Sequence, residues 1–151
     1  MARSVTAKKG VKQGKPPYLL DEQVGFILRQ VWQRHSSIFS RDIGTNLTPT
    51  QWAALSKLAE TGPCSQNQLG RLTAMDVATI KGVIDRLTAR GLTETSQDPE
   101  DGRRLLVSLT RAGQQLAEKL APNAIAITRE TLAPLDAKER ELLMVLLNKL
   151  R

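Results

Sequence analysis

Mostly apolar side chains recur at helical spacing along this chain, and breaks in the pattern mark where the predicted helices end. From residue 21 to about residue 41 this spacing predicts one long amphipathic helix. "NLTPT" interrupts it, and Thr48 followed by Pro49 begins a second helix that ends at Gly62-Pro63. The inward positions of the two helices are Val24, Ile27, Leu28, Val31, His35 and Ile38, then Trp52, Leu55 and Leu58.

Two shorter helices are predicted next. Ser65 and Gln68 have the S-x-x-Q spacing of a capping box, which predicts a third helix as far as about Leu72. A fourth helix begins near Asp76 and ends at Gly91, where a helix-ending glycine belongs. Two short helices a few residues apart, the second amphipathic, form a helix-turn-helix pattern. The inward face of the second is Ile80, Val83, Ile84 and Leu87.

Beyond Gly91 the apolar period falls to two, which predicts a β-hairpin with Pro99 and Gly102 in its turn. A hairpin that follows a helix-turn-helix is the wing of a winged helix. Its alternating positions are Leu92, Glu94 and Ser96 before the turn, and Leu105, Val107 and Leu109 after it.

Two further helices complete the pattern, so the predicted fold class is mainly α-helical with one small β-hairpin wing. Thr110 is placed to cap a long helix that we expect to bend at Pro122. Asp136 and Glu139 have capping-box spacing at the start of the last helix. The apolar faces are Leu116, Leu120, Ala124 and Ile127 in the first, and Leu142, Leu143, Leu146, Leu147 and Leu150 in the second.

The net charge of +7 is concentrated at the start of the chain. Residues 1–17 contain five lysines and arginines and no acid, and almost no large apolar residue, which predicts a disordered basic arm. Residues 62–110, which hold the helix-turn-helix and the hairpin, contain six basic and six acidic side chains and are neutral. Bulk charge alone therefore does not establish nucleic-acid binding.

The sequence offers few groups for catalysis, metal binding or membrane insertion. One cysteine, Cys64, and one histidine, His35, make neither an internal disulfide nor a typical structural zinc site, so we expect no metal and no cofactor. No carboxylate pair, phosphate loop or nucleophile–base arrangement stands out, which makes an enzyme the weakest class. No apolar run approaches the roughly 20 residues of a membrane span, so we expect a cytoplasmic protein without membrane contact.

Three stretches resemble the MarR family of bacterial transcriptional regulators, in the order that this family uses. They are "LTPTQWAALSKLAETGPCSQNQLGRL", "DVATIKGVIDRLTARGL" and "DPEDGRRLLVSLTRAGQQL", and the resemblance covers about residues 20 to 150. It implies a homodimer that binds double-stranded operator DNA. It also implies a helical dimerisation region at residues 18–47 and 111–151 and a winged helix-turn-helix DNA-binding domain at residues 48–110.

The candidate DNA-binding residues lie on the third and fourth predicted helices and on the wing. The start and the polar side of the fourth helix suit the major groove, and the start of the third suits phosphate contact. Arg103 and Arg104 suit a narrow minor groove, and Asp101 with Arg103 fits the D-x-R wing pattern of the family. Asp98 and Asp101 are then structural. The candidates are Ser65, Gln66, Gln68, Val77, Ala78, Thr79, Lys81, Gly82, Arg86, Arg103 and Arg104.

The resemblance also implies a site for a small effector, because members of this family often bind aromatic acids between the first, second and fifth helices. Trp32, His35 and Phe39 are one helical turn apart, and Trp52 is on the second helix. Aromatic residues at this spacing are also typical of a core. Arg34 and Arg41 are nearby cations for a carboxylate.

We therefore expect a repressor that leaves a pseudo-palindromic operator when a small aromatic carboxylate or phenol binds. Three alternatives remain open at this point. The first is a constitutive or architectural DNA-binding protein. The second is a thiol-based redox regulator that uses Cys64, and the third is a hydrolase that pairs Cys64 with His35.

Overall fold

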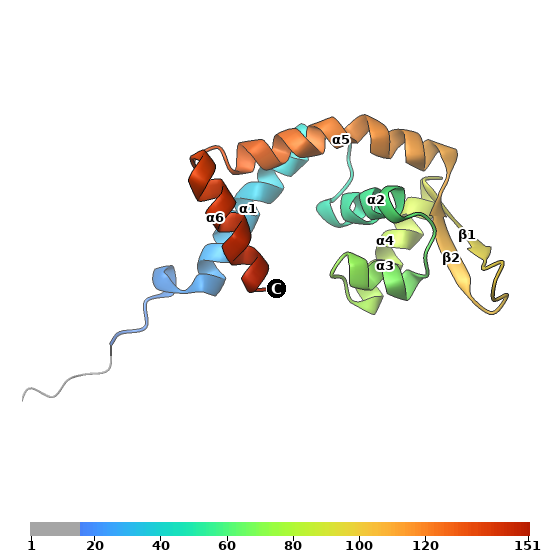
Figure 1. Ribbon diagram of the computed structural model, residues 1–151, viewed down its shortest axis with the longest axis horizontal. Helices are drawn as coiled ribbons and strands as arrows, with labels where there is room; N and C mark the ends of the chain where they lie inside the picture. Colours follow the sequence, from blue (N-terminus) through green and yellow to red (C-terminus); the bar gives the residue numbers. More distant parts are fainter. Residues whose placement is uncertain (1–15) are drawn as a thin grey trace, which may run out of the picture.

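The computed structural model describes residues 16–151, so most of the predicted basic arm lies outside the described residues. Figure 1 shows α5 running across one side of the molecule, with α1 and α6 at one end and α2, α3, α4 and the hairpin at the other. The mainly helical fold with one small hairpin is as predicted. The elements are η1 (Leu20–Glu22), α1 (Val24–Asp42), α2 (Pro49–Thr61), α3 (Gln66–Leu72), α4 (Val77–Ala89), β1 (Thr93–Gln97), β2 (Leu105–Leu109), α5 (Arg111–Thr131) and α6 (Ala137–Lys149).

Side-chain caps fix the starts of the five helices from α2 to α6. In each case the capping oxygen accepts a hydrogen bond from a backbone N–H that has no partner within the helix. A complete capping box forms at the start of α6, as predicted. At α3 only half of the predicted box is present, because the Ser65 hydroxyl accepts from the Gln68 backbone N–H but the Ser65 backbone N–H does not donate to the Gln68 side chain. The capping residues are Thr48, Ser65, Asp76, Thr110 and Asp136.

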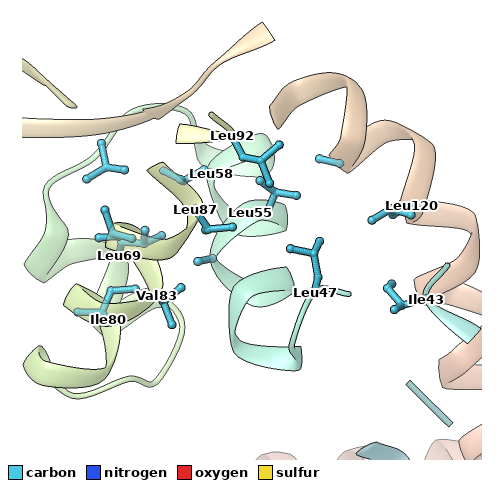
Figure 2. Close-up of a cluster of buried hydrophobic side chains, with 14 of the residues drawn as sticks. Ile43, Leu47, Leu55, Leu58, Leu69, Ile80, Val83, Leu87, Leu92 and Leu120 are labelled. Carbon is cyan, nitrogen blue, oxygen red and sulfur yellow. The ribbon is translucent and has the colours of Figure 1, made fainter. Parts of the chain in front are cut away.

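The main core lies where α4 packs against α2 and α3 (Figure 2). All four residues predicted to face inward on α4 are buried. They meet Leu55 and Leu58 of α2 and Leu69 of α3, while Ile43 and Leu120 extend the same cluster toward α5. This packing holds the exposed side of α4 at a fixed orientation to the rest of the molecule.

The hairpin pairs Thr93 with Leu109 at its base and Gln97 with Leu105 near its turn. Cys64 extends this two-stranded sheet by a short bridge, because its backbone exchanges two hydrogen bonds with that of Val107, at 3.1 and 2.8 Å. The predicted alternation holds only near the base. Val107 is buried but Leu105 is exposed, since the outer part of the hairpin extends beyond the core.

Helix α5 connects the two ends of the molecule. It continues through Pro122 and forms a gentle arch (Figure 1). At its first turn, Gly113 lies so close to the hairpin that a Cβ there would overlap the carbonyl oxygen of Leu92. Near its middle, Asn123 donates a hydrogen bond of 3.1 Å to the carbonyl oxygen of Ile43, at the end of α1. The wing and α1 are thereby held to one helix.

Two apolar surfaces are not covered by any other part of residues 16–151. Helix α6 buries none of its residues, and the first half of α1 leaves its apolar side chains exposed. None of the helices in residues 16–151 has the length and apolar character that a membrane crossing requires. The exposed apolar residues are Leu19, Leu20, Val24, Ile27, Leu28 and Val31 on the first surface, and Leu142, Met144, Val145, Leu146, Leu147 and Leu150 on the second.

We predict that Gly113→Ala destabilises the protein. The added Cβ must push α5 away from the Leu92 carbonyl, and such overpacking costs about 1–3 kcal/mol, or roughly 3–10 °C in Tm for a chain of this size. Gly82→Ala is the matched control. A Cβ at Gly82 meets only the end of the Arg86 side chain at 3.7 Å, and alanine favours a helix over glycine. Thermal unfolding followed by circular dichroism compares the two, and an unchanged Tm for Gly113→Ala would contradict the close packing.

Candidate functional site

The exposed face of α4 has the chemistry expected of a surface that reads a partner. Val77, Ala78 and Thr79 occupy its first turn and all three are exposed, Val77 by 67%. Asp76 caps this turn, and the N–H of Thr79 that donates to its carboxylate holds the pKa of Asp76 below its usual value. The Asp76 carboxylate is therefore committed to the cap, while the side chains of the first turn point outward.

One turn further along α4, Lys81 and Gly82 continue the same face. Lys81 forms an ion pair with Asp85 at 2.7 Å, and both side chains are solvent-exposed, so this pair is weak and easily exchanged. The packing of the fold does not require a glycine at position 82, because a Cβ would fit there. A glycine that the fold does not need leaves room for a partner to approach the helix closely.

The start of α3 lies beside this face. Gln68 is exposed and Ser65 is half-buried as the helix cap. Gln66 lines a cavity of about 380 Å³ between α4 and the hairpin, together with Asp85 and Leu105. The structure thus groups Ser65, Gln66 and Gln68 with α4, and among them Gln68 is the most open to solvent.

The two arginines of the wing have different surroundings. Asp98 accepts a hydrogen bond from the Glu100 backbone and forms an ion pair with Arg104 at 3.8 Å, and its side chain is only 11% exposed. Asp101 accepts a hydrogen bond of 3.1 Å from the Arg103 backbone. Both acids therefore stabilise the turn, as predicted. In the described part of the chain no acid pairs with the Arg103 guanidinium, which leaves this side chain available at the tip.

A separate cavity of about 230 Å³ lies between α1, α2 and α5. It brings together the four predicted aromatic residues Trp32, His35, Phe39 and Trp52 from two helices. The rings of Trp32 and His35 are 5.5 Å apart between centroids and tilted by 34°. The remaining lining is Pro49, Ala124, Ile127 and Thr128, which no sequence pattern assigned to this site.

His35 is held from one side by the end of α5. Its Nδ1 lies 2.9 Å from the hydroxyl oxygen of Thr131, and this hydroxyl also donates to the carbonyl oxygen of Ile127 at 2.9 Å. Partial burial lowers the pKa of His35, because the charged imidazolium loses hydration there. Burial therefore favours the neutral form of the ring. Thr131 is 96 residues away in sequence, and no local pattern pointed to it.

The structure does not bring Arg34 and Arg41 into the lining of this cavity. Arg34 donates to the backbone oxygens of Glu130 and Thr131, where it stabilises the negative end of the α5 dipole. Arg41 makes two hydrogen bonds with the carboxylate of Asp42, at 2.6 and 2.7 Å, and holds the pKa of that carboxyl below its usual value. Both cations are therefore engaged by groups of the chain itself.

The environment of Cys64 does not favour reactivity. The side chain is 4% exposed, and burial raises the pKa of the thiol. A thiolate is the reactive form of cysteine, so this environment suppresses oxidation and nucleophilic attack. His35 makes its hydrogen bond with Thr131 and belongs to the cavity between α1, α2 and α5, so the two residues do not form a catalytic pair. Across residues 16–151 no three or more His, Cys, Asp or Glu side chains gather in a way that would hold a metal ion.

Comparison with known proteins identifies relatives across nearly the whole chain. The family model described as "MarR family" matches residues 47–105. The HTH-type transcriptional repressor NicR of Pseudomonas putida is 41% identical over 135 residues, which are 89% of this chain and 85% of NicR.

Two solved structures share both sequence and fold. A probable transcriptional regulator from Pseudomonas aeruginosa is 59% identical, with a TM-score of 0.86 over 88% of this chain and 100% of that one. Bordetella bronchiseptica BpsR, whose DNA binding is regulated by 6-hydroxynicotinic acid, is 43% identical, with a TM-score of 0.85 over 89% of this chain and 97% of BpsR.

Proposed function

Because this chain belongs to the MarR family of transcriptional regulators, we propose that it represses transcription as a homodimer on a pseudo-palindromic operator and leaves the DNA when a small aromatic acid binds. The observation that supports this most directly is the presence of two separate surfaces in one chain. One is the exposed face of α4 with the wing, and the other is the aromatic cavity between α1, α2 and α5. We assign residues 48–110 to DNA binding, and residues 18–47 and 111–151 to dimerisation.

We propose that α4 enters the major groove and that the wing follows the adjacent minor groove. The small, exposed first turn of α4 suits base edges, and Val77 suits the methyl group of thymine. Arg103 is free to enter a narrow minor groove, whose concentrated negative potential attracts a guanidinium. Arg104 is partly neutralised by Asp98 and contributes less. Recognition of the DNA sequence then comes from α4, and affinity comes largely from Arg103 and from phosphate contacts.

We propose that the two uncovered apolar surfaces, α6 and the first half of α1 with η1, pack against a second copy of the chain. A helix as apolar as α6 with no buried residue is typical of a protein–protein interface. A two-fold axis through this interface presents two α4 helices, and these reach successive major grooves about 10 base pairs apart. Dimerisation therefore sets the spacing of the two operator half-sites.

The effector that we propose is a single aromatic ring with a carboxylate. A cavity of about 150 Å³ is enough for benzene, so about 230 Å³ accommodates one ring with small substituents. Trp32, Phe39 and Trp52 supply flat apolar contacts. Since no cation of the described residues lines the cavity, the carboxylate faces its open side, where Trp32 is 56% exposed and water keeps the charge hydrated. The 6-hydroxynicotinic acid that regulates BpsR has this chemistry.

We propose that α5 communicates effector binding to the DNA-binding surface. The same helix lines the cavity with Ala124, Ile127 and Thr128 and contacts the base of the wing at Gly113. A ligand that fits better when α5 is shifted against α1 and α2 changes the distance between the two α4 helices of the dimer. The extent of DNA release is then set by the difference in ligand affinity between the two arrangements.

We expect Arg103→Ala to weaken operator binding at least tenfold, because it removes both the charge and the shape of a minor-groove arginine. Arg104→Ala, the adjacent control, should weaken binding less, since Asp98 already pairs with that side chain. Fluorescence anisotropy with a labelled operator at fixed salt measures both. If the Arg103 variant folds, dimerises and binds like the parent, the wing does not contact DNA as proposed.

The double variant Leu142→Lys/Leu146→Lys should shift the protein from dimer to monomer, because two charges replace apolar contacts at the centre of the α6 surface. Operator affinity should fall with it, as one half-site is then bound at a time. The control is Leu105→Lys, which changes an equally exposed leucine on the hairpin. Sedimentation equilibrium gives the mass of each, and a dimer that survives both lysines would place the interface elsewhere.

For the effector, titration of the operator complex with benzoate, salicylate and 6-hydroxynicotinate should release the DNA. Trp32→Ala should raise the concentration needed for half-release about tenfold, because it removes one wall of the cavity. Gln33→Ala is the control, since Gln33 is an exposed neighbour on α1 that does not line the cavity. Failure of every acid to release DNA would indicate a constitutive DNA-binding protein.

A further inference from the structure

We propose that Thr131 fixes the tautomer of His35, so that the cavity selects aromatic acids carrying a hydrogen-bond donor on the ring, a hydroxyl or an N–H, over acids that lack one. This inference rests on the proposed effector site, and it adds the chemical group by which that site distinguishes its ligands. His35 is the recognising residue, and Thr131 acts through it as a positioning residue.

The position of the Thr131 hydroxyl proton determines the tautomer of His35. A threonine hydroxyl has one proton to donate. The Thr131 oxygen lies 2.9 Å from the carbonyl oxygen of Ile127, which can only accept, so the proton lies on that line. Placing it toward His35 would leave two acceptor oxygens facing each other at hydrogen-bond distance with no proton between them. The Thr131 oxygen therefore acts as the acceptor for its neighbour on the other side.

That neighbour is Nδ1 of His35, at 2.9 Å, so Nδ1 carries the proton. A neutral imidazole has one N–H and one bare nitrogen, and partial burial favours the neutral form of this ring. Nε2 is then a bare acceptor. No other group in residues 16–151 hydrogen-bonds to this ring.

Nε2 is also accessible from outside the protein. In the described part of the chain no fully buried side-chain nitrogen or oxygen lacks a partner, so an unpartnered Nε2 must be accessible. His35 lines the cavity, and Thr131 occupies the Nδ1 side of the ring. A ligand held against Trp32, Phe39 and Trp52 therefore meets a histidine whose Nε2 can accept a hydrogen bond.

The consequence for ligand choice follows from donor and acceptor chemistry. A ring hydroxyl or ring N–H donates to Nε2, whereas a carboxylate has only acceptor oxygens and is repelled by a bare nitrogen. The acid group therefore turns away from His35, in agreement with a lining that contains no cation. An acid without a ring donor leaves Nε2 desolvated and unpaired, which should weaken its binding about tenfold or more.

The tautomer is measured directly, because the chain has a single histidine. Long-range ¹H–¹⁵N spectra of the ¹⁵N-labelled, full-length protein without ligand should show the proton on Nδ1. Thr131→Val has nearly the same shape but no acceptor, and it should shift the proton to Nε2 or give a mixture. Thr131→Ser retains the hydroxyl and should behave like the parent. A proton on Nε2 in the parent would overturn the proposal.

Isothermal titration calorimetry measures ligand selection in two matched sets. The first set is 6-hydroxynicotinate and nicotinate, and the second is the three hydroxybenzoates and benzoate. In the parent and in Thr131→Ser, 6-hydroxynicotinate should bind tenfold tighter than nicotinate. At least one of the three hydroxybenzoates should likewise bind tenfold tighter than benzoate. In Thr131→Val the preference should fall below about threefold. Equal affinities in the parent, together with release of DNA, would overturn this inference and leave the proposed function standing. Absence of binding by every acid would overturn both, whatever the tautomer.

Discussion

The close contact between the first turn of α5 and the base of the hairpin fixes how the two ends of the molecule are joined. Gly113 lies against the Leu92 carbonyl, while the hydroxyl of Thr110 caps α5 and donates to the carbonyl oxygen of Gly91 at 2.6 Å. The end of α4, the hairpin and α5 are thereby joined in one rigid connection. At its other end α5 is held by Arg34 and His35 of α1. A structural change at the aromatic cavity therefore either displaces α5 or is opposed by the contacts that hold α5 in place.

Acidic side chains determine which basic groups are available to a partner. Asp98 pairs with Arg104, Asp85 with Lys81, and Asp42 with Arg41, whereas Arg103 at the tip of the wing is opposed by no acid of the described residues. The pair of Lys81 is exposed on both sides and exchanges readily with phosphate oxygens, since such pairs are worth only about 0–1 kcal/mol, whereas the Asp98 partner of Arg104 is largely covered. The neutral charge of residues 62–110 is thus compatible with the proposed DNA interaction, which relies on a few placed cations.

The described chain also leaves two apolar faces exposed. Its main core lies among α2, α3 and α4, but α6 and the first half of α1 leave their apolar faces in contact with water. Burial of these faces by a second copy would stabilise the half of the molecule that lacks a core of its own. It would also link dimer geometry to the cavity, because α1 contributes to both. Helix α1 would then take part in both the effector response and dimerisation.

Features that depend only on neighbouring residues can be predicted from the amino-acid sequence. Helix starts at Thr48, Ser65 and Asp76, the inward face of α4 and the wing turn at Asp98 were all predictable, because caps, turns and amphipathic spacing act over a few residues. The grouping of Trp32, His35, Phe39 and Trp52 followed from helical spacing together with the resemblance to the family, and the cavity brings these four side chains together.

Which polar and charged side chains already have a partner within the chain, and which remain free, depends on how distant helices pack. Arg34 is engaged by carbonyl groups 96 and 97 residues away, His35 is oriented by Thr131, and Cys64 is buried beside Val107. The exposure of Leu105 likewise depends on how far the hairpin extends beyond the core. The spacing of residues along the sequence does not predict such contacts. They form when helices distant in the chain pack together, and each polar group then bonds to the partner that lies within reach.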